Sequence, residues 1–129
     1  MVDAEEALRA QTYRLMSRLL AAPPNRALLD LVSDLKGDET PLGRGLAVLA
    51  ARAAETSPQA AADEYGDLFI GIGRGELVPF ASYYLTGFLN EKPLARLRGE
   101  MARLGIARAD HVKEPEDHIA ALCEMMAGL

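Results

Sequence analysis

The sequence predicts an all-α protein, a helical bundle of about six helices. Half of its 129 residues are hydrophobic, yet only 5% are aromatic and none is tryptophan, so leucine, alanine, valine and methionine must form most of the core. Ser-Pro and Thr-Pro pairs, which favour helix starts, alternate with glycine and proline stops. The apolar run at residues 77–85 could be a strand, but no second strand is available to pair with it. At this length we expect one domain, residues 1–129.

Four helices are expected in the first half of the chain. Each begins at a residue whose side chain can accept a hydrogen bond from the first turn, and each ends near glycine or proline. In Thr40-Pro41 and Ser57-Pro58 the capping residue is followed by a proline suited to the first helical position. In chain order the four helices are predicted over residues 3–22, 25–37, 40–56 and 57–69.

Three alternating glycines at residues 71–75 make a regular helix costly. A phosphate cradle is one interpretation, but the dinucleotide fingerprint would need glycine where Glu76 stands, and the Gly-Lys-Ser/Thr of a P-loop is missing. We therefore favour a hinge loop. A short helix is expected after Pro79, followed by a helix with an apolar stripe over residues 94–104, which ends at Gly105 and has a solvated face bearing Arg96, Arg98 and Arg103.

The last helix is expected to begin within Glu114-Pro115-Glu116-Asp117-His118, with Pro115 in its first turn and three carboxylates at its positive end. A rotation of about 100° per residue places His118 at the edge of the apolar stripe and Asp117 nearly opposite it. Glu116 is expected to be more solvated than its neighbours. The stripe itself comprises Ile119, Leu122, Cys123, Met126 and Leu129.

Two interpretations of this cluster remain open. In one, the acidic residues only cap a helix and His118 is a partly buried side chain. In the other, Glu114, Asp117 and His118 form a polar recognition site, since a carboxylate beside an imidazole raises its affinity for protons and cations. A zinc site from His111, His118 and Cys123 would have no recognised ligand spacing, so we expect no metal and no cofactor.

Charge and composition exclude several classes of protein. The formal net charge of −5 argues against a nucleic-acid partner. The N-terminal segment is acidic rather than basic, and no stretch is apolar for long enough to insert into a membrane. The single Cys123, on an apolar stripe, is expected to be a buried thiol. These features predict a cytoplasmic protein.

Three segments together resemble the TorD/DmsD family of redox-enzyme maturation chaperones. They are Glu64-Tyr65-Gly66-Asp67-Leu68-Phe69-Ile70-Gly71, Pro79-Phe80-Ala81-Ser82-Tyr83-Tyr84-Leu85 and Glu114-Pro115-Glu116-Asp117-His118-Ile119-Ala120. Their order and spacing match as well, and the last is the most specific. Family members generally continue for several more helices after that motif, whereas this chain ends at Leu129, so it is C-terminally short relative to the family.

The resemblance implies an all-helical cytoplasmic chaperone that binds the twin-arginine signal peptide, or the apo-form, of a molybdopterin oxidoreductase precursor. It also implies a set of residues that contact the peptide or shape its site: Pro79, Ser82, Tyr84, Glu114, Pro115, Asp117 and His118. Such a function needs no nucleophile and no metal, and we expect no enzymatic activity.

Two other functions are kept as alternatives. A small acid/base enzyme would use Asp117 and His118, although neighbouring helical residues diverge by about 100°. A helical scaffold that only oligomerises is the third. Because the stripe on the last helix would be an exposed apolar patch, we expect either marginal stability or a homodimer, with or without helices exchanged about the hinge at residues 71–75.

Overall fold

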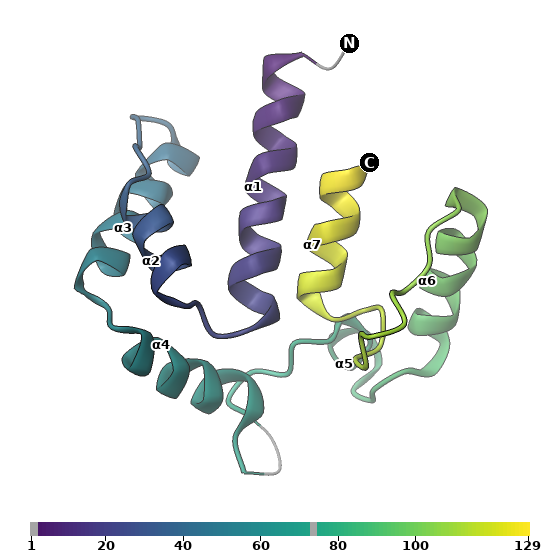
Figure 1. Cartoon of the computed structure of the whole chain (residues 1–129). Coiled ribbons are helices and arrows are strands. Elements are labelled where there is room, and N and C mark those ends of the chain that lie inside the picture. Colours follow the sequence, from purple (N-terminus) through teal and green to yellow (C-terminus); the bar gives the residue numbers. More distant parts are fainter. Residues whose placement is uncertain (1–2, 73–74) are drawn as a thin grey trace. The chain divides into compact units, whose positions relative to one another are not determined.

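The structure, a computed structural model, describes residues 3–72 and 75–129. Within these ranges it has seven α-helices and one π-helical turn, and no β-strand, which confirms the all-α prediction (Figure 1). The chain forms two compact units. The first unit contains Met1–Ala21 and Leu77–Leu129, and the second contains Ala22–Glu76. The predicted hinge lies partly outside the described residues, at positions 73 and 74.

The second unit contains helices α2 (Arg26–Ser33), α3 (Pro41–Glu55) and α4 (Pro58–Tyr65) and the π-helical turn η1 (Gly66–Ile70). Three side chains accept hydrogen bonds from first-turn amides as the sequence predicts: Asn25, Thr40 and Ser57. Helix α2 packs against α3, and the buried residues of these two helices are Leu28, Leu29, Val32, Gly43, Ala50 and Ala53.

Two predicted boundaries in the second unit are wrong. Helix α2 ends at Ser33 rather than at Lys36-Gly37. Gly37 is not a helix cap. It allows the chain to pass close to α3, since a Cβ there would lie 2.2 Å from the carbonyl oxygen of Gly43. The α-helix predicted to reach Phe69 changes at Gly66 into η1, which closes with a bond of 2.7 Å from the Gly71 amide to the Gly66 carbonyl.

The first unit contains helices α1 (Ala4–Ala21), α5 (Ala81–Thr86), α6 (Glu91–Leu104) and α7 (Ile119–Gly128). Asp3 caps α1, as predicted, by accepting a hydrogen bond of 2.8 Å from the Glu6 amide. Figure 1 shows α1 and α7 side by side and antiparallel. Near one end of this pair the Ser17 hydroxyl donates to the carbonyl of Ala120, at 2.8 Å.

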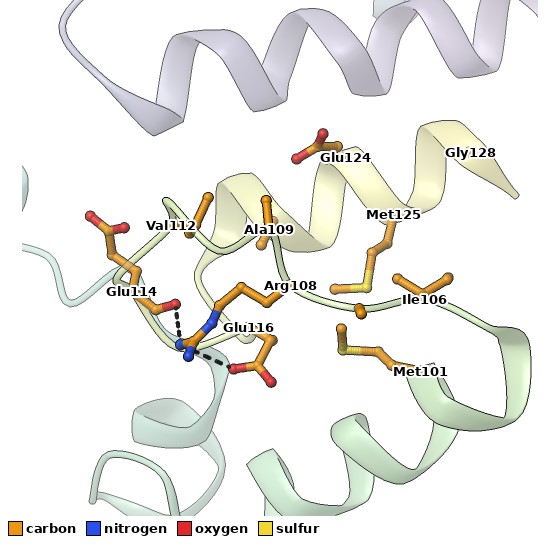
Figure 2. Close-up of a pocket in the computed structure, with 12 residues that line it drawn as sticks. Met101, Ile106, Arg108, Ala109, Val112, Glu114, Glu116, Glu124, Met125 and Gly128 are labelled. Atoms are coloured by element: carbon orange, nitrogen blue, oxygen red, sulfur yellow. Dashed lines mark hydrogen bonds and ion pairs between the residues drawn. The ribbon is translucent and has the colours of Figure 1, made fainter.

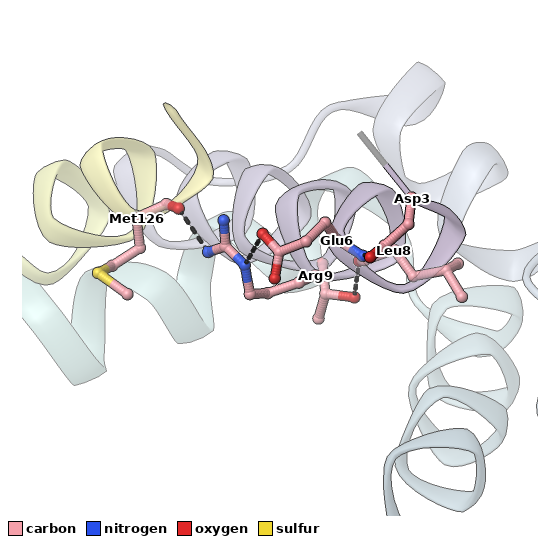
Figure 3. Close-up of polar contacts among 6 residues, drawn as sticks. Asp3, Glu6, Leu8, Arg9 and Met126 are labelled. Atoms are coloured by element: carbon pink, nitrogen blue, oxygen red, sulfur yellow. Dashed lines mark hydrogen bonds and ion pairs between the residues drawn. The ribbon is translucent and has the colours of Figure 1, made fainter. Parts of the chain in front are cut away.

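Arg9 connects α1 to the other end of α7. Its Nη1 donates a hydrogen bond of 2.7 Å to the carbonyl of Met126, while its Nε pairs with Glu6 at 3.0 Å (Figure 3). The last carbonyls of a helix have no partner within the helix, and a cation there also complements the helix dipole. Arg9 therefore stabilises the C-terminal turn of α7.

The start and the buried face of the last helix differ from the prediction. Helix α7 begins at Ile119, and Pro115 lies in the turn before it. Its buried residues are Ala120, Cys123 and Ala127, whereas Ile119, Met126 and Leu129 are exposed. Cys123 is a buried free thiol, as predicted, and burial raises its pKa. No described helix combines the length and the apolar character needed to cross a lipid bilayer.

Candidate functional site

The second and third sequence motifs meet in the first unit. The Ile119 amide donates to the Pro79 carbonyl at 2.8 Å, and the Ala81 amide donates to the Asp117 carbonyl at 3.1 Å. Phe80 and His118 lie opposite one another in an isolated antiparallel bridge. Segments far apart in sequence are thus joined by backbone hydrogen bonds immediately before α5 and α7. The first motif, residues 64–71, belongs to the second unit.

The side chain of Asp117 stabilises this junction. It is only 2% exposed, and its Oδ2 accepts a hydrogen bond of 2.8 Å from the Ser82 amide in the first turn of α5. First-turn amides have no partner within the helix, so the carboxylate acts as a cap supplied from a distant segment. The other oxygen, Oδ1, is buried and has no hydrogen-bond partner among the described residues. The prediction that Asp117 points away from the buried side is therefore wrong, because residue 117 is not helical.

Ser82 is also buried and holds the next turn of the chain. It is 1% exposed, and its Oγ accepts a hydrogen bond of 3.0 Å from the Asn90 amide just before α6. Its own amide is bound to Asp117. Ser82 and Asp117 therefore shape the surface from behind rather than presenting polar atoms to a ligand.

His118 caps α7. Its Nδ1 accepts a hydrogen bond of 3.0 Å from the Ala120 amide, so in the neutral imidazole the proton is assigned to Nε2. The ring packs edge-on against Phe80, with 5.1 Å between the ring centroids. Burial lowers the pKa of His118, against the opposing influence of the Glu114 and Asp117 carboxylates. Its surroundings thus favour the neutral imidazole.

Glu116 forms a bidentate ion pair with an arginine that the sequence placed on a solvated face. Arg98 donates to its two carboxylate oxygens at 2.7 and 3.0 Å, and Arg108 lies 3.6 Å from the carboxylate. The Glu116 side chain is only 11% exposed, so the expectation that it is well solvated is wrong. The hydrogen bonds from Arg98 lower the pKa of Glu116, and they raise the pKa of Arg98 itself. This pairing joins α6 to the third motif.

Two neighbouring cavities lie beside this junction, both within the first unit. The apolar cavity has a volume of about 320 Å³ and is lined by Met101, Ile106, Ala107, Arg108, Ala109, Val112, Glu114, Glu116, Ala121, Glu124, Met125 and Gly128. The second cavity has a volume of about 280 Å³ and is lined by Ser17, Ala21, His111, Val112, Glu114, Pro115, His118, Ala120, Ala121 and Glu124. Val112, Glu114, Ala121 and Glu124 line both, and we call these four residues the shared wall.

The predicted site residues fall into three groups around these cavities. Glu114, Pro115 and His118 line the second cavity. Pro79, Ser82 and Asp117 form the hydrogen-bonded junction behind it. Tyr84 is 64% exposed on α5 and lines neither cavity. That these residues bind a peptide stays a prediction.

No pattern in the sequence indicates that several of these residues border a cavity. Met101 lies on the apolar stripe of α6, where a core residue is expected. Ile106, Arg108 and Val112 belong to an irregular stretch without hydrophobic periodicity. Met125 follows Glu124 on α7, a helix whose buried face differs from the apolar stripe that the sequence predicts. Methionine is common on adaptable binding surfaces, and this is the signal that could have drawn attention to residues 101 and 125.

The described residues show no convergent metal-ligand set. No group of three or more histidine, cysteine, aspartate or glutamate side chains in this part of the chain is placed to hold a metal ion. Asp117 and His118 also point their hydrogen-bonding atoms at different amides, those of Ser82 and Ala120.

Comparison with known proteins identifies the family. The family model for the nitrate reductase delta subunit matches residues 35–129. Proteins named chaperone protein TorD are similar to part of the chain: that of Aliivibrio fischeri is 34% identical over 68 residues, 51% of this chain and 32% of that protein. That of Vibrio cholerae O395 is 35% identical over 69 residues, 53% of this chain and 31% of that protein. The matched segment thus spans about a third of the length of these curated relatives.

A solved structure shares the fold. The crystal structure of a redox-enzyme maturation protein from Archaeoglobus fulgidus superposes with a TM-score of 0.67 at 21% identity, covering 99% of this chain and 72% of the other. The family match covers well over half of the chain and agrees with the resemblance carried by the three motifs. The chain therefore belongs to the TorD-like nitrate reductase delta subunit family.

Proposed function

We propose that the protein is a cytoplasmic chaperone for the maturation of a redox enzyme. It binds the twin-arginine signal peptide of a molybdopterin oxidoreductase precursor before export. Its relatives are named chaperones, and its second and third motifs are joined by backbone hydrogen bonds beside the two cavities. Binding and release of a peptide require no reacting group.

One observation carries this proposal: a cavity with a methionine-lined end also has carboxylate side chains in its lining, and two of them, Glu114 and Glu124, form no ion pair among the described residues. In Figure 2, Met101, Ile106 and Met125 gather at one end of the apolar cavity, and Arg108, Glu114 and Glu116 lie at the other. A twin-arginine signal peptide combines two guanidinium groups with an apolar run. Guanidinium groups form strong hydrogen bonds to carboxylates, and methionine side chains adapt to varied apolar partners.

Replacing the arginine pair of such a peptide by glutamines should weaken binding by about tenfold or more, because the charge-assisted hydrogen bonds are lost. The measurement is fluorescence anisotropy of a labelled peptide in which Arg-Arg precedes a leucine- and alanine-rich run, titrated with the whole chain at low and high salt. The glutamine peptide is the matched control, and only the arginine peptide should lose affinity as salt is raised.

Equal affinity for the two peptides would contradict the recognition of arginine. Absence of binding to either peptide, together with a concentration-dependent increase in mass in sedimentation, would favour the alternative of a helical scaffold.

A further inference from the structure

We propose that the connection between α6 and α7 is a movable strap over the two cavities and that Arg108 is its latch. The strap comprises residues 106–113. While Arg108 contacts residues 114 and 116 the strap closes both cavities, and when these contacts break it swings away and opens them. Access is controlled in this way whatever the cavities bind, so the strap and the proposed function can fail separately.

The strap contributes to the lining of both cavities. Its lining residues are Ile106, Ala107, Arg108, Ala109 and Val112 in the apolar cavity, and His111 and Val112 in the second. The other lining residues belong to α1, α6, α7 and the turn before α7. Figure 2 shows the strap as an irregular segment that runs past α7. Because Val112 of the shared wall borders both cavities, displacement of the strap opens the two together.

Few contacts hold the middle of the strap. Residues 107–111 are exposed, and only Ile106 and Val112 are half-buried. The Val112 amide donates to the Ala109 carbonyl at 3.0 Å, a bond within the strap itself. Among the residues that the structure describes, no backbone hydrogen bond joins residues 107–113 to another part of the chain. Segments with exposed backbone and little buried apolar surface open at a small cost in free energy.

The two ends of the strap, in contrast, are fixed. Gly105 ends α6 with a left-handed backbone, φ 73°, and the Ile106 amide donates back to the Met101 carbonyl at 2.8 Å. Beyond the other end, residues 117 and 119 are hydrogen-bonded to residues 81 and 79. The strap therefore moves between two firm attachments, and its motion does not require α6 or α7 to unfold.

The side chain of Arg108 joins the strap to the residues that follow it. Its Nη1 donates to the Glu114 carbonyl at 3.1 Å and lies 3.6 Å from Oε1 of Glu116 (Figure 2). No other side chain of residues 106–113 forms a hydrogen bond or an ion pair within the described part of the chain. Arg108 therefore provides the contact whose loss releases the strap.

The latch is separate from the ion pair that holds α6. Arg98 donates to both oxygens of Glu116 at 2.7 and 3.0 Å, so this carboxylate stays paired when Arg108 leaves it. The Arg108 side chain is 40% exposed, whereas that of Glu116 is 11% exposed. An ion pair with a partly exposed member is weak and is sensitive to salt. The strap can thus open without disturbing the junction behind the cavities.

Closure of the strap keeps apolar surface away from water. Met101, which lines the apolar cavity together with Ile106 of the strap, is only 5% exposed. Exposed apolar patches promote association with other molecules. The latched strap limits this exposure, and release of Arg108 increases it.

Pulsed electron paramagnetic resonance measures the position of the strap directly, with no ligand present. Spin labels are attached after Asp110→Cys in the strap and Gln11→Cys on α1, in a chain whose native thiol is removed by Cys123→Ala. Residues 11 and 110 are exposed and line neither cavity. Into this labelled parent chain are introduced Arg108→Gln, which removes the latch, and Arg108→Lys, which keeps its charge. Arg96→Gln is the matched control, since Arg96 is exposed on α6 and forms no ion pair among the described residues.

The labelled parent at low salt should show one main distance between the labels and a minor, longer distance from the open strap. Arg108→Gln should increase the fraction of the longer distance about threefold, the effect of losing a partly exposed ion pair, and Arg108→Lys should lie between the two. Raising the salt to about 1 M should have the same effect on the parent and little effect on Arg108→Gln. Arg96→Gln should behave as the parent, and circular dichroism should show that the variants are folded.

Identical distances and an identical salt response in the parent and in Arg108→Gln would show that Arg108 is not the latch. A single narrow distance in every variant at every salt concentration would show that the strap is rigid. Either result would overturn the inference, and if Arg108→Gln does not fold, the salt response of the parent decides alone. Because no peptide is added, these results leave the proposed function untouched.

Discussion

Asp117→Ala should destabilise the first unit by about 2–3 kcal/mol, the cost of leaving a buried amide without its acceptor. In the native protein Oδ2 of Asp117 accepts from the Ser82 amide, and both residues are almost completely buried. Alanine supplies no acceptor, and water cannot easily replace one there. The measurement is urea unfolding followed by circular dichroism, combined with hydrogen exchange of the Ser82 amide by NMR.

Asp117→Asn is the matched control. Asparagine keeps a side-chain oxygen for Ser82 and removes a buried charge, so its loss of stability should stay within about 1 kcal/mol. The Ser82 amide should remain protected from exchange in this variant and become unprotected in Asp117→Ala. Equal stability of the alanine variant and wild type, or equal protection of this amide in both variants, would show that the hydrogen bond does not hold α5.

His118→Ala should cost about 2 kcal/mol at pH 8, because it removes the α7 cap and the ring packed against Phe80. His118→Asn retains a capping oxygen and should recover about half of that loss. Thermal or urea unfolding of the two variants and wild type across pH 5–8 measures both effects.

The same series should reveal a pH dependence that only wild type has. Burial lowers the pKa of His118 from its ordinary value of 6.5, so the unfolded chain binds this proton at a higher pH than the folded chain does. Stability from this residue is complete above pH 6.5 and decreases as the pH falls from there through the lower folded pKa. Wild type should therefore lose stability below pH 6.5 relative to His118→Asn. Parallel pH profiles would mean that the imidazole does not titrate with folding.

Local signals in the sequence predict most of the helices. Asp3 caps α1, Thr40 and Ser57 cap helices at the positions that the prolines after them also indicate, and Gly105 ends α6. Each of these boundaries depends on hydrogen bonds within a few residues, so the neighbouring sequence contains the information needed to place it.

The start of α7 shows where local rules fail. A proline among carboxylates satisfies every local criterion for a helix start, yet Pro115 lies in a turn because the chain around Asp117 and His118 pairs with residues 79–81 instead. Residue 117 lies outside the helix, so the helical periodicity of α7 does not determine the direction of its side chain. Asp117 was consequently predicted on the solvent side, although it is the most buried carboxylate of this motif.

The candidate site was predicted only where a motif carries it. Glu114, Pro115 and His118 line a cavity, but the ion pair between Arg98 and Glu116 joins residues 18 apart in sequence that no periodicity relates. The apolar end depends on a glycine turn that brings Ile106 back to Met101 and on the packing of α7 nearby. Such neighbours arise from the tertiary structure, so a single sequence gives no direct signal for them.

NMR of methyl-labelled methionines locates a bound peptide most directly. On addition of the peptide in which Arg-Arg precedes a leucine- and alanine-rich run, the methyl signals of Met101 and Met125 should shift, because both side chains line the apolar cavity. Those of Met16 and Met126, which line neither cavity, should change little, and at equal concentration the more weakly binding glutamine peptide should shift the Met101 and Met125 signals much less. Shifts confined to Met16 or Met126, or equal shifts with the glutamine peptide, would contradict binding of a basic, apolar segment at these cavities.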